Sequence, residues 1–256
     1  MSGRVAFAVA AHPDDIELMM AGTLLLLGEA GHELHVMNIA NGSCGTIGET
    51  RGAIVARRTD EAKASAALMR AAFHPPLTND IEILYDLTLL RRLAAVVREV
   101  RPTILLVQSP QDYMEDHVNA CRLAVTAAFA RGMPNFTTDP PMVPTEQDVT
   151  VYHALPWGLR GPLRERIVPD LYVDISTTLQ RKRAALACHR SQKEWLDRSQ
   201  GLDSYLDTME SMALEAGRMS GRFTHAEGWR RRLHLGFCNE HSDPLRDALG
   251  PRTSIT

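Results

Sequence analysis

The sequence predicts a single α/β domain built around a mostly parallel β-sheet. Short apolar runs such as Val5–Ala10 and 103–107 are typical of strands that are buried on both faces, as in parallel sheets. Helix-like segments alternate with these runs through the first half of the chain, as expected for right-handed βαβ units. The 256 residues fit one large domain over 1–256 better than two small ones, because no linker divides them.

Each expected element follows from local composition. Strands are expected where apolar and β-branched residues cluster, at 5–10, 33–39, 82–85, 103–107, 149–153 and 170–175. Helices are expected where Ala, Leu, Arg and Glu dominate between stop signals, at 17–30, 51–72, 87–100, 116–131, 177–200 and 203–221. The Pro-rich loop 134–147 is long enough to act as a substrate lid. We expect a core over 4–235 and a flexible tail over 243–256.

Composition and charge exclude several classes of protein. A formal net charge of -3 at pH 7 argues against a broad nucleic-acid surface, and no Gly-x-Gly-x-x-Gly follows the first strand to bind a nucleotide. No apolar stretch reaches the ~18 residues of a membrane helix, and no export signal is evident, so residence in the cytoplasm is expected. The cysteines are far apart and are expected to be free thiols: Cys44, Cys121, Cys188 and Cys238.

The most informative polar motif is Ala11-His12-Pro13-Asp14-Asp15, which directly follows the first apolar run. Pro13 cannot continue a strand, so the chain turns there and presents one imidazole and two carboxylates at the carboxyl end of the strand. Open α/β sheets bind their ligands at this edge. His12 and Asp15 can both reach one metal ion, which leaves Asp14 as a carboxylate outside the ligand set. Metal-assisted hydrolysis requires this combination.

A second polar run follows the strand 103–107 and opens the next helix. Its His117 is a candidate third ligand, because the carboxyl ends of parallel strands meet at one edge of the sheet. Asp116 is a candidate outer carboxylate that fixes the tautomer of an imidazole. Three ligands leave a position for water, as in catalytic zinc sites, and Asp14 is then placed to accept a proton from it. Simpler interpretations of these residues stay open: Asp14 or Asp15 is an N-cap of the following helix, and His117 is an ordinary surface residue of its helix.

These residues resemble the PIG-L/LmbE-like N-acetylglucosaminyl deacetylases, and the resemblance covers 4–235. The further motifs that match are Asn41-Gly42 with Gly45, Arg58-Thr59-Asp60-Glu61-Ala62, Val100-Arg101-Pro102, the segment 182–192 and Ala226-Glu227. The resemblance implies a Rossmann-like three-layer fold, a zinc cofactor and hydrolysis of the N-acetyl group of a small-molecule amino sugar or its conjugate. It also implies a homo-oligomer, either a trimer or a hexamer.

By this resemblance, His12, Asp15 and His117 bind zinc and Asp14 acts as the general base. Two imidazoles and one carboxylate also suit Fe²⁺, Co²⁺ or Mn²⁺. The candidate substrate-binding residues are Asn41, Gly42, Arg58, Asp80, Tyr113 and His189. For most of these a simpler structural explanation stays open, namely ion pairing within a helix, turn geometry or an exposed helix position.

Met114 departs from the family pattern, because many relatives carry a histidine at this position. That histidine stabilises the oxyanion or acts as an acid, and a thioether can do neither. Loss of an oxyanion donor costs about 10²–10³ in rate. Tyr113, His153 and His189 are candidates to replace it. Three functions therefore stay open: a deacetylase, an amidase for a larger amide such as a thiol conjugate, and a catalytically weakened sugar-binding relative.

Overall fold

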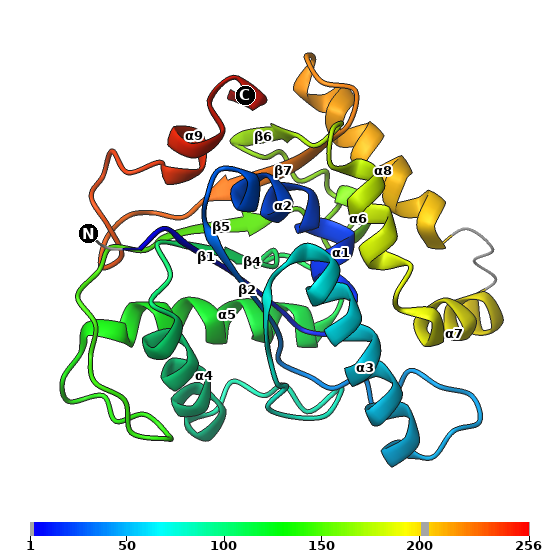
Figure 1. The fold of residues 1–256 in the computed structure, drawn as a ribbon, viewed down its shortest axis with the longest axis horizontal. Coiled ribbons are helices and arrows are strands. Elements are labelled where there is room, and N and C mark those ends of the chain that lie inside the picture. The colour runs from blue at the N-terminus through cyan, green and yellow to red at the C-terminus, as the bar shows by residue number, and fades with distance from the viewer. Residues whose placement is uncertain (1–2, 201–204, 256) are drawn as a thin grey trace.

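A single eight-stranded β-sheet organises the residues that the computed structural model describes, 3–200 and 205–255 (Figure 1). The strands lie in the order β3-β2-β1-β4-β5-β7-β6-β8. Their bounds are β1 Val5–Ala10, β2 Glu33–Asn38, β3 Ala72–His74, β4 Ile104–Val107, β5 Thr150–Ala154, β6 Leu171–Asp174, β7 Ala226–Arg231 and β8 Thr253–Ile255. The strands from β3 to β5 pair in parallel, and β7, β6 and β8 extend the sheet with antiparallel pairs. The predicted α/β domain with a mostly parallel sheet is confirmed.

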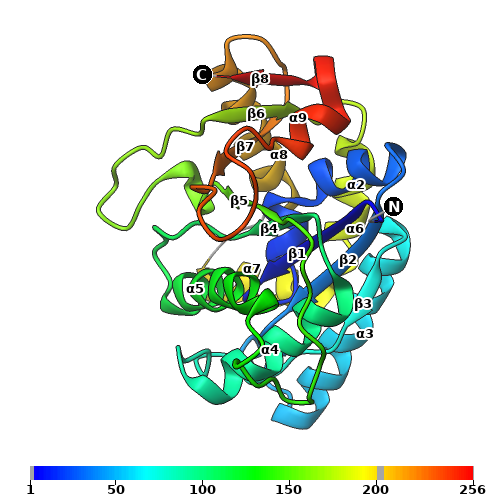
Figure 2. The same ribbon diagram turned by 90° about the vertical axis from the view of Figure 1, so that its left-hand side faces the viewer.

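Helices cover both faces of the sheet and complete a three-layer arrangement (Figure 2). Their bounds are α1 Asp15–Met19, α2 Ala21–Glu29, α3 Arg51–Met69, α4 Leu87–Val100, α5 Glu115–Phe129, α6 Leu179–Leu186, α7 Arg190–Gln200, α8 Tyr205–Ser220 and α9 Pro244–Leu249. Strand β1 alternates between two buried clusters: Ala6, Ala8 and Ala10 belong to one, Phe7 and Val9 to the other. The first cluster includes side chains of α1, α2, α6 and α8, and the second includes those of α4 and α5. β1 is therefore a fully buried central strand.

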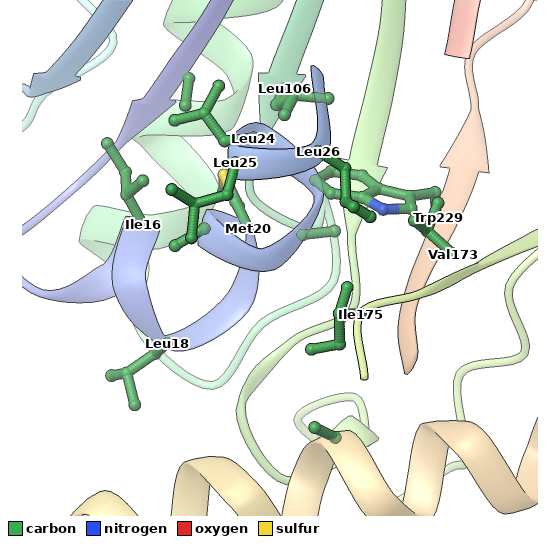
Figure 3. Packing of buried hydrophobic residues seen from close by; sticks show 14 of the residues in the cluster. Ile16, Leu18, Met20, Leu24, Leu25, Leu26, Leu106, Val173, Ile175 and Trp229 are labelled. Carbon is green, nitrogen blue, oxygen red and sulfur yellow. The ribbon is translucent and has the colours of Figure 1, made fainter. Parts of the chain in front are cut away.

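Glu227 of β7 holds the start of helix α2. Its carboxylate accepts hydrogen bonds from the N–H groups of Gly22 and Thr23, at 2.8 and 2.7 Å, and from Nζ of Lys182 at 2.6 Å. The indole N–H of Trp229 donates to the Thr23 hydroxyl at 3.0 Å, and Figure 3 shows this ring among the core side chains around α1 and α2. The first N–H groups of a helix have no partner within it, so these bonds anchor α2 and, through it, the preceding helix α1.

Two of the predicted helices are each divided in the structure. The segment 17–30 forms α1 and α2, because Met20 leaves the helical conformation with φ of -132°. The segment 177–200 forms α6 and α7. Of the helix predicted over 203–221, residues 205–220 form α8, and 203–204 lie outside the described residues.

The strand predicted over 82–85 is wrong. Ile83 is buried there, but Leu84 and Tyr85 are exposed, and the segment runs without a strand partner in the described structure. The third strand is instead Ala72–His74, which pairs with β2. Strands β7 and β8 were not predicted from the sequence.

The expected flexible tail over 243–256 is also corrected. Leu245 of α9 is fully buried, and Asp243 accepts a hydrogen bond from the Tyr152 hydroxyl at 2.7 Å. The strand Thr253–Ile255 pairs with β6 at the edge of the sheet. The core therefore extends past 235, because β8 supplies a partner for backbone groups of β6 that would otherwise stand at the edge of the sheet.

Two predictions from composition concern membranes and cysteines. Among the residues that the structure describes, no helix combines the length and the hydropathy needed to cross a membrane. The four cysteines are free thiols, as predicted, and Cys44 is the exposed one.

Candidate active site

The turn after β1 places the motif at the carboxyl end of the central strand. Asp14 adopts φ of 112°, a left-handed conformation that residues with a side chain rarely adopt. The turn is closed by two hydrogen bonds, from the His12 N–H to Asp15 Oδ2 at 2.7 Å and from the Asp15 N–H to the His12 carbonyl at 3.2 Å. Asp14 stands at the N-cap of α1 but its side chain makes no capping bond. Its carboxylate is therefore not used as a helix cap.

The structure brings His12, Asp15 and His117 together. One potential ligand atom from each lies within 4.8 Å of the others, and this is the one such group among the described residues. The Nδ1 atom of His12 is 3.6 Å from Asp15 Oδ2, and the Nε2 atom of His117 is 3.5 Å from Asp15 Oδ1. Two imidazole nitrogens and a carboxylate are a typical donor set for a divalent transition metal.

The second nitrogen of each imidazole ring is held by a carboxylate. His12 Nε2 lies 2.9 Å from Asp116 Oδ2, and His117 Nδ1 lies 3.0 Å from Asp112 Oδ1. Asp116 also accepts the N–H of Ile81 at 2.7 Å, which fixes that carboxylate in place. Metal-binding histidines usually carry such a carboxylate, since it sets the tautomer and the ring orientation. The residues present therefore fit a metal ion.

The charged groups around this cluster shift one another's pKa values. Burial disfavours the protonated form of His12, but hydrogen bonds to Asp116 and Asp15 outweigh it and raise the pKa of His12 to about 10. Burial likewise opposes ionisation of Asp15, yet the charge of His117 and the hydrogen bonds from His12 hold its pKa well below the usual range. Without a metal ion, protonated His12 thus supplies positive charge beside Asp15 and Asp116.

Asp14 lies next to this cluster in a different environment. Its pKa is raised to about 6 by burial and by the negative charge of Asp15, although Arg58 and Tyr205 act in the opposite direction. The Tyr205 hydroxyl donates a hydrogen bond to Oδ2, and Nη2 of Arg58 lies 3.8 Å from Oδ1. A buried carboxylate whose pKa is close to neutrality is suited to accept and return a proton.

Arg58 occupies space that two glycines leave free. It is 2% exposed and donates to the Pro13 carbonyl at 2.7 Å. A Cβ atom on Gly42 would lie 2.4 Å from Arg58 Cδ, and one on Gly45 would lie 2.5 Å from its Nη1. Asp80 in turn holds this loop, because its carboxylate accepts the N–H of Gly42 at 2.7 Å. The absence of side chains at the glycines allows Arg58 to reach the turn after β1.

A cavity of about 230 Å³ opens over the cluster. Of the six candidate substrate-binding residues, Arg58, Asp80 and Tyr113 line it. Asn41 instead donates to Asn79 at 2.9 Å, and Gly42 shapes the loop beneath Arg58. His189 is 1% exposed and faces Glu17 at 3.3 Å, away from the cavity lining.

Neither the expected lid nor two of the expected oxyanion donors lie at this cavity. The loop 134–147 contributes no lining residue, because Arg98 and Arg131 hold it through the carbonyls of Met142 and Gln147, at 2.9 and 2.8 Å. Like His189, His153 is absent from the lining; its ring contacts the Gln108 carbonyl at 3.1 Å. Tyr113 is the candidate donor that lines the cavity, together with Met114.

Four residues of the site were not assigned a role from the sequence. Gln108 accepts the Ala11 N–H at 2.8 Å, and Asn38 donates to the His12 carbonyl at 2.6 Å, so both support the turn. Asp112 holds His117, and Tyr205 holds Asp14. Gln108 and Asp112 follow a predicted strand, which is a usable signal, whereas nothing near Tyr205 in the sequence points to the site.

The fold and the cluster together define an α/β protein with a candidate metal centre at the carboxyl ends of two neighbouring parallel strands. A family profile described as PIG-L, GlcNAc-PI de-N-acetylase, matches residues 7–129. Diacetylchitobiose deacetylase of Thermococcus kodakarensis is 31% identical over 232 residues, which cover 86% of this chain and 79% of that protein. The chain therefore belongs to the PIG-L family, as the motifs predicted.

Two further similarities involve proteins named for different reactions. The 4-oxalmesaconate hydratase of Pseudomonas putida is 27% identical over 196 residues, 73% of this chain and 74% of that protein. The solved structure of N,N'-diacetylchitobiose deacetylase from Pyrococcus horikoshii matches with a TM-score of 0.76 and 23% identity, over 91% of this chain and 85% of that one. The fold is thus shared by proteins named for two different reactions.

Proposed function

We propose that the protein is a zinc-dependent hydrolase that removes an N-acetyl group from an amino sugar or an N-acetylglucosamine-containing conjugate. The observation that carries this proposal is the placement of Asp14, a buried carboxylate directly beside His12, Asp15 and His117 but outside that set of donors. Zinc at these donors would polarise an amide carbonyl and lower the pKa of a water molecule. The site would then contain both an electrophile activator and a base.

The protein's own residues would handle the proton. Asp14 accepts a proton from the attacking water and returns it to the amide nitrogen, which leaves as an amine when the C–N bond breaks. Tyr205 fixes one oxygen of this carboxylate, and Arg58 keeps positive charge near the other. The overall reaction consumes one water and yields acetate and a free amine.

The charge of the cavity does not by itself separate an amide from a polyanionic substrate. Four carboxylates line it, those of Asp14, Asp15, Asp80 and Asp112. The guanidinium of Arg58 and either a protonated His12 or a bound metal ion offset their charge. The chain is 31% identical to the deacetylase over 86% of its length and 27% identical to the hydratase over 73%, so hydration of a polyacid is the less favoured alternative. Hydrolysis of a larger amide would use the same residues and differs only in the substrate.

The first experiment measures acetate release from a panel of N-acetylglucosamine derivatives by zinc-loaded protein and by its Asp14→Asn variant. We expect turnover by the wild type and a loss of about 10²–10⁴ in the variant, the usual contribution of a general base. Zinc content should be the same in both, since Asp14 is not a proposed ligand. Turnover of larger amides without acetate release would support an amidase, and equal activity of the two proteins would contradict the role of Asp14.

Two further features stay predictions. Assembly as a trimer or hexamer follows from the family resemblance and is tested by light scattering of the purified protein. Residence in the cytoplasm is tested by cell fractionation.

A further inference from the structure

We infer that the cavity is built for an amide substrate that carries an alkyl or aryl group next to the sugar; this specificity rests on the proposed function. The inference comes from six apolar side chains that line the cavity together with the polar cluster. We call them the apolar wall: Leu18, Met19, Leu155, Trp157, Trp195 and Leu196.

The apolar wall is assembled from three separate segments of the chain. Leu18 and Met19 belong to α1, Leu155 and Trp157 follow β5, and Trp195 and Leu196 belong to α7. Met19, Trp157 and Trp195 are only half-buried, and each packs against the main core cluster. They therefore contribute to the core with part of their surface and line the cavity with another part.

A sugar without an apolar substituent would be poorly matched to this wall. Its hydroxyl groups would leave water, yet the four aliphatic side chains have no atom that could donate or accept a strong hydrogen bond. The indole rings could stack on one sugar face, but this leaves the aliphatic part of the wall without a suitable partner. An alkyl or aryl group would instead gain from leaving water there. Met114, where many relatives have histidine, makes the lining less polar still.

A neighbouring polar cavity limits how far such a group extends. Gly45 and Trp195 also line this second cavity of about 400 Å³. Its lining includes Arg57, which forms ion pairs with Glu49 and Glu194 at 3.0 Å each. An apolar substituent gains nothing from this charged lining, so we expect it to stay within the first cavity of about 230 Å³.

The test compares kcat/KM of zinc-loaded protein for three amides: N-acetylglucosamine, its benzyl β-glycoside and N-hexanoylglucosamine. We expect at least a tenfold preference for one of the two apolar compounds. Preference for the glycoside places the apolar group on the leaving amine, and preference for the hexanoyl amide places it on the acyl side. Equal kcat/KM for all three compounds would overturn the inference.

Variants of Trp195 show whether the apolar wall causes the preference. Trp195→Ala should reduce the ratio of kcat/KM for the preferred compound over N-acetylglucosamine at least tenfold, whereas Trp195→Phe should retain most of it. Leu163→Ala is a matched control, because Leu163 is an apolar residue that is 88% exposed and does not line the cavity. An equal loss for all compounds in Trp195→Ala would overturn the inference.

A binding measurement separates this inference from the proposed function. Calorimetry with benzyl β-glucoside and methyl β-glucoside requires no turnover, since neither compound contains an amide. At least tenfold tighter binding of the benzyl compound, lost in Trp195→Ala, would support the apolar wall even if no amide is hydrolysed. Equal binding of the two glucosides, together with equal kcat/KM for N-hexanoylglucosamine and N-acetylglucosamine, would contradict it even if N-acetylglucosamine is deacetylated.

Discussion

The hydroxyl of Tyr205 donates a hydrogen bond to Oδ2 of Asp14, although 191 positions separate the two residues in the sequence. Both side chains are buried, and the bond joins the first residue of α8 to the N-cap of α1. The other oxygen, Oδ1, is the one that lies 3.8 Å from Arg58. Tyr205 therefore sets the orientation of the carboxylate that we propose as the base.

Tyr205→Phe should lower kcat and leave KM nearly unchanged, because the lost hydrogen bond orients the base and does not contact the substrate. A buried hydrogen bond of this kind is worth about 1–3 kcal/mol, which corresponds to a loss of about fivefold to 150-fold. Steady-state kinetics measure the effect, with Tyr85→Phe as a control outside the cavity. A change in KM alone would contradict the positioning role.

Tyr113→Phe tests whether Tyr113 stabilises the oxyanion in this protein, where Met114 stands at the position of the histidine that many relatives carry. Tyr113 is 59% exposed, and partial burial together with the charge of Asp15 raises the pKa of its hydroxyl, so it keeps its proton and can donate to a developing oxyanion. We expect a loss of about 10²–10³ in kcat, as for other oxyanion donors. Met114→His should partly rescue the Phe variant. Unchanged kcat in Tyr113→Phe would assign the role to another group.

Zinc binding should release protons at pH 7. In the metal-free protein the pKa of His12 is about 10, and burial of His117 is outweighed by Asp15 and Asp112 so that its pKa is raised too. His12 is therefore largely protonated at neutral pH, and its proton must leave before the ring can bind a metal ion; the raised pKa of His117 acts in the same direction. Zinc affinity should fall as the pH is lowered below 7. Calorimetry in buffers of different ionisation enthalpy counts the protons, and an absence of proton release would contradict this prediction.

Gly42→Ala should impair activity more than its matched variant Gly31→Ala. Both glycines have positive φ, 78° and 86°, so both substitutions strain the backbone by about 1–2 kcal/mol. A Cβ atom at Gly42 also collides with Arg58, whereas one at Gly31 meets nothing within 4 Å. Thermal melts should therefore show a loss for both variants, and kcat/KM should drop for Gly42→Ala alone. Equal activity of the two variants would show that Arg58 can be displaced without consequence.

His153→Gln should weaken the dependence of stability on pH between about 4 and 6.5. Burial, aided by the charges of Arg232 and Arg230, lowers the pKa of His153 to about 4, against 6.5 for an unperturbed ring. In this window the unfolded chain binds a proton that the folded protein does not, so stability is lost as the pH falls. The full difference is about 3 kcal/mol. Urea titrations at several pH values measure it, and the exposed His241→Gln serves as a control.

The proximity of the candidate metal ligands could be predicted from the sequence because it depends on local order and one general rule. His12 and Asp15 follow one apolar run, and His117 follows another that proves to be the neighbouring strand. Residues at the ends of adjacent parallel strands come together whatever the details of packing. The same reasoning reaches Gln108 and Asp112, which lie in the polar run after β4.

Other parts of the structure depend on contacts that no local pattern encodes. Tyr205 reaches Asp14 through the packing of α8, and nothing in its neighbourhood distinguishes it from a core tyrosine. Strand β7 contains charged residues because Glu227 binds the start of α2, so it lacks the apolar run of the central strands. His189 has the spacing of a site residue but is used to pair with Glu17 in the interior.

The division of the cavity between segments has a consequence for how substrate choice can change among relatives. The proposed metal ligands and the base lie on the turn after β1 and in the first turns of α1 and α5, whereas Trp157 and Trp195 lie on segments that contribute none of these groups. Exchange of the segment after β5 or of α7 could therefore alter what the enzyme accepts while its reactive centre is inherited unchanged. Evolution or protein engineering could therefore direct the same reaction toward new compounds by changing these segments alone.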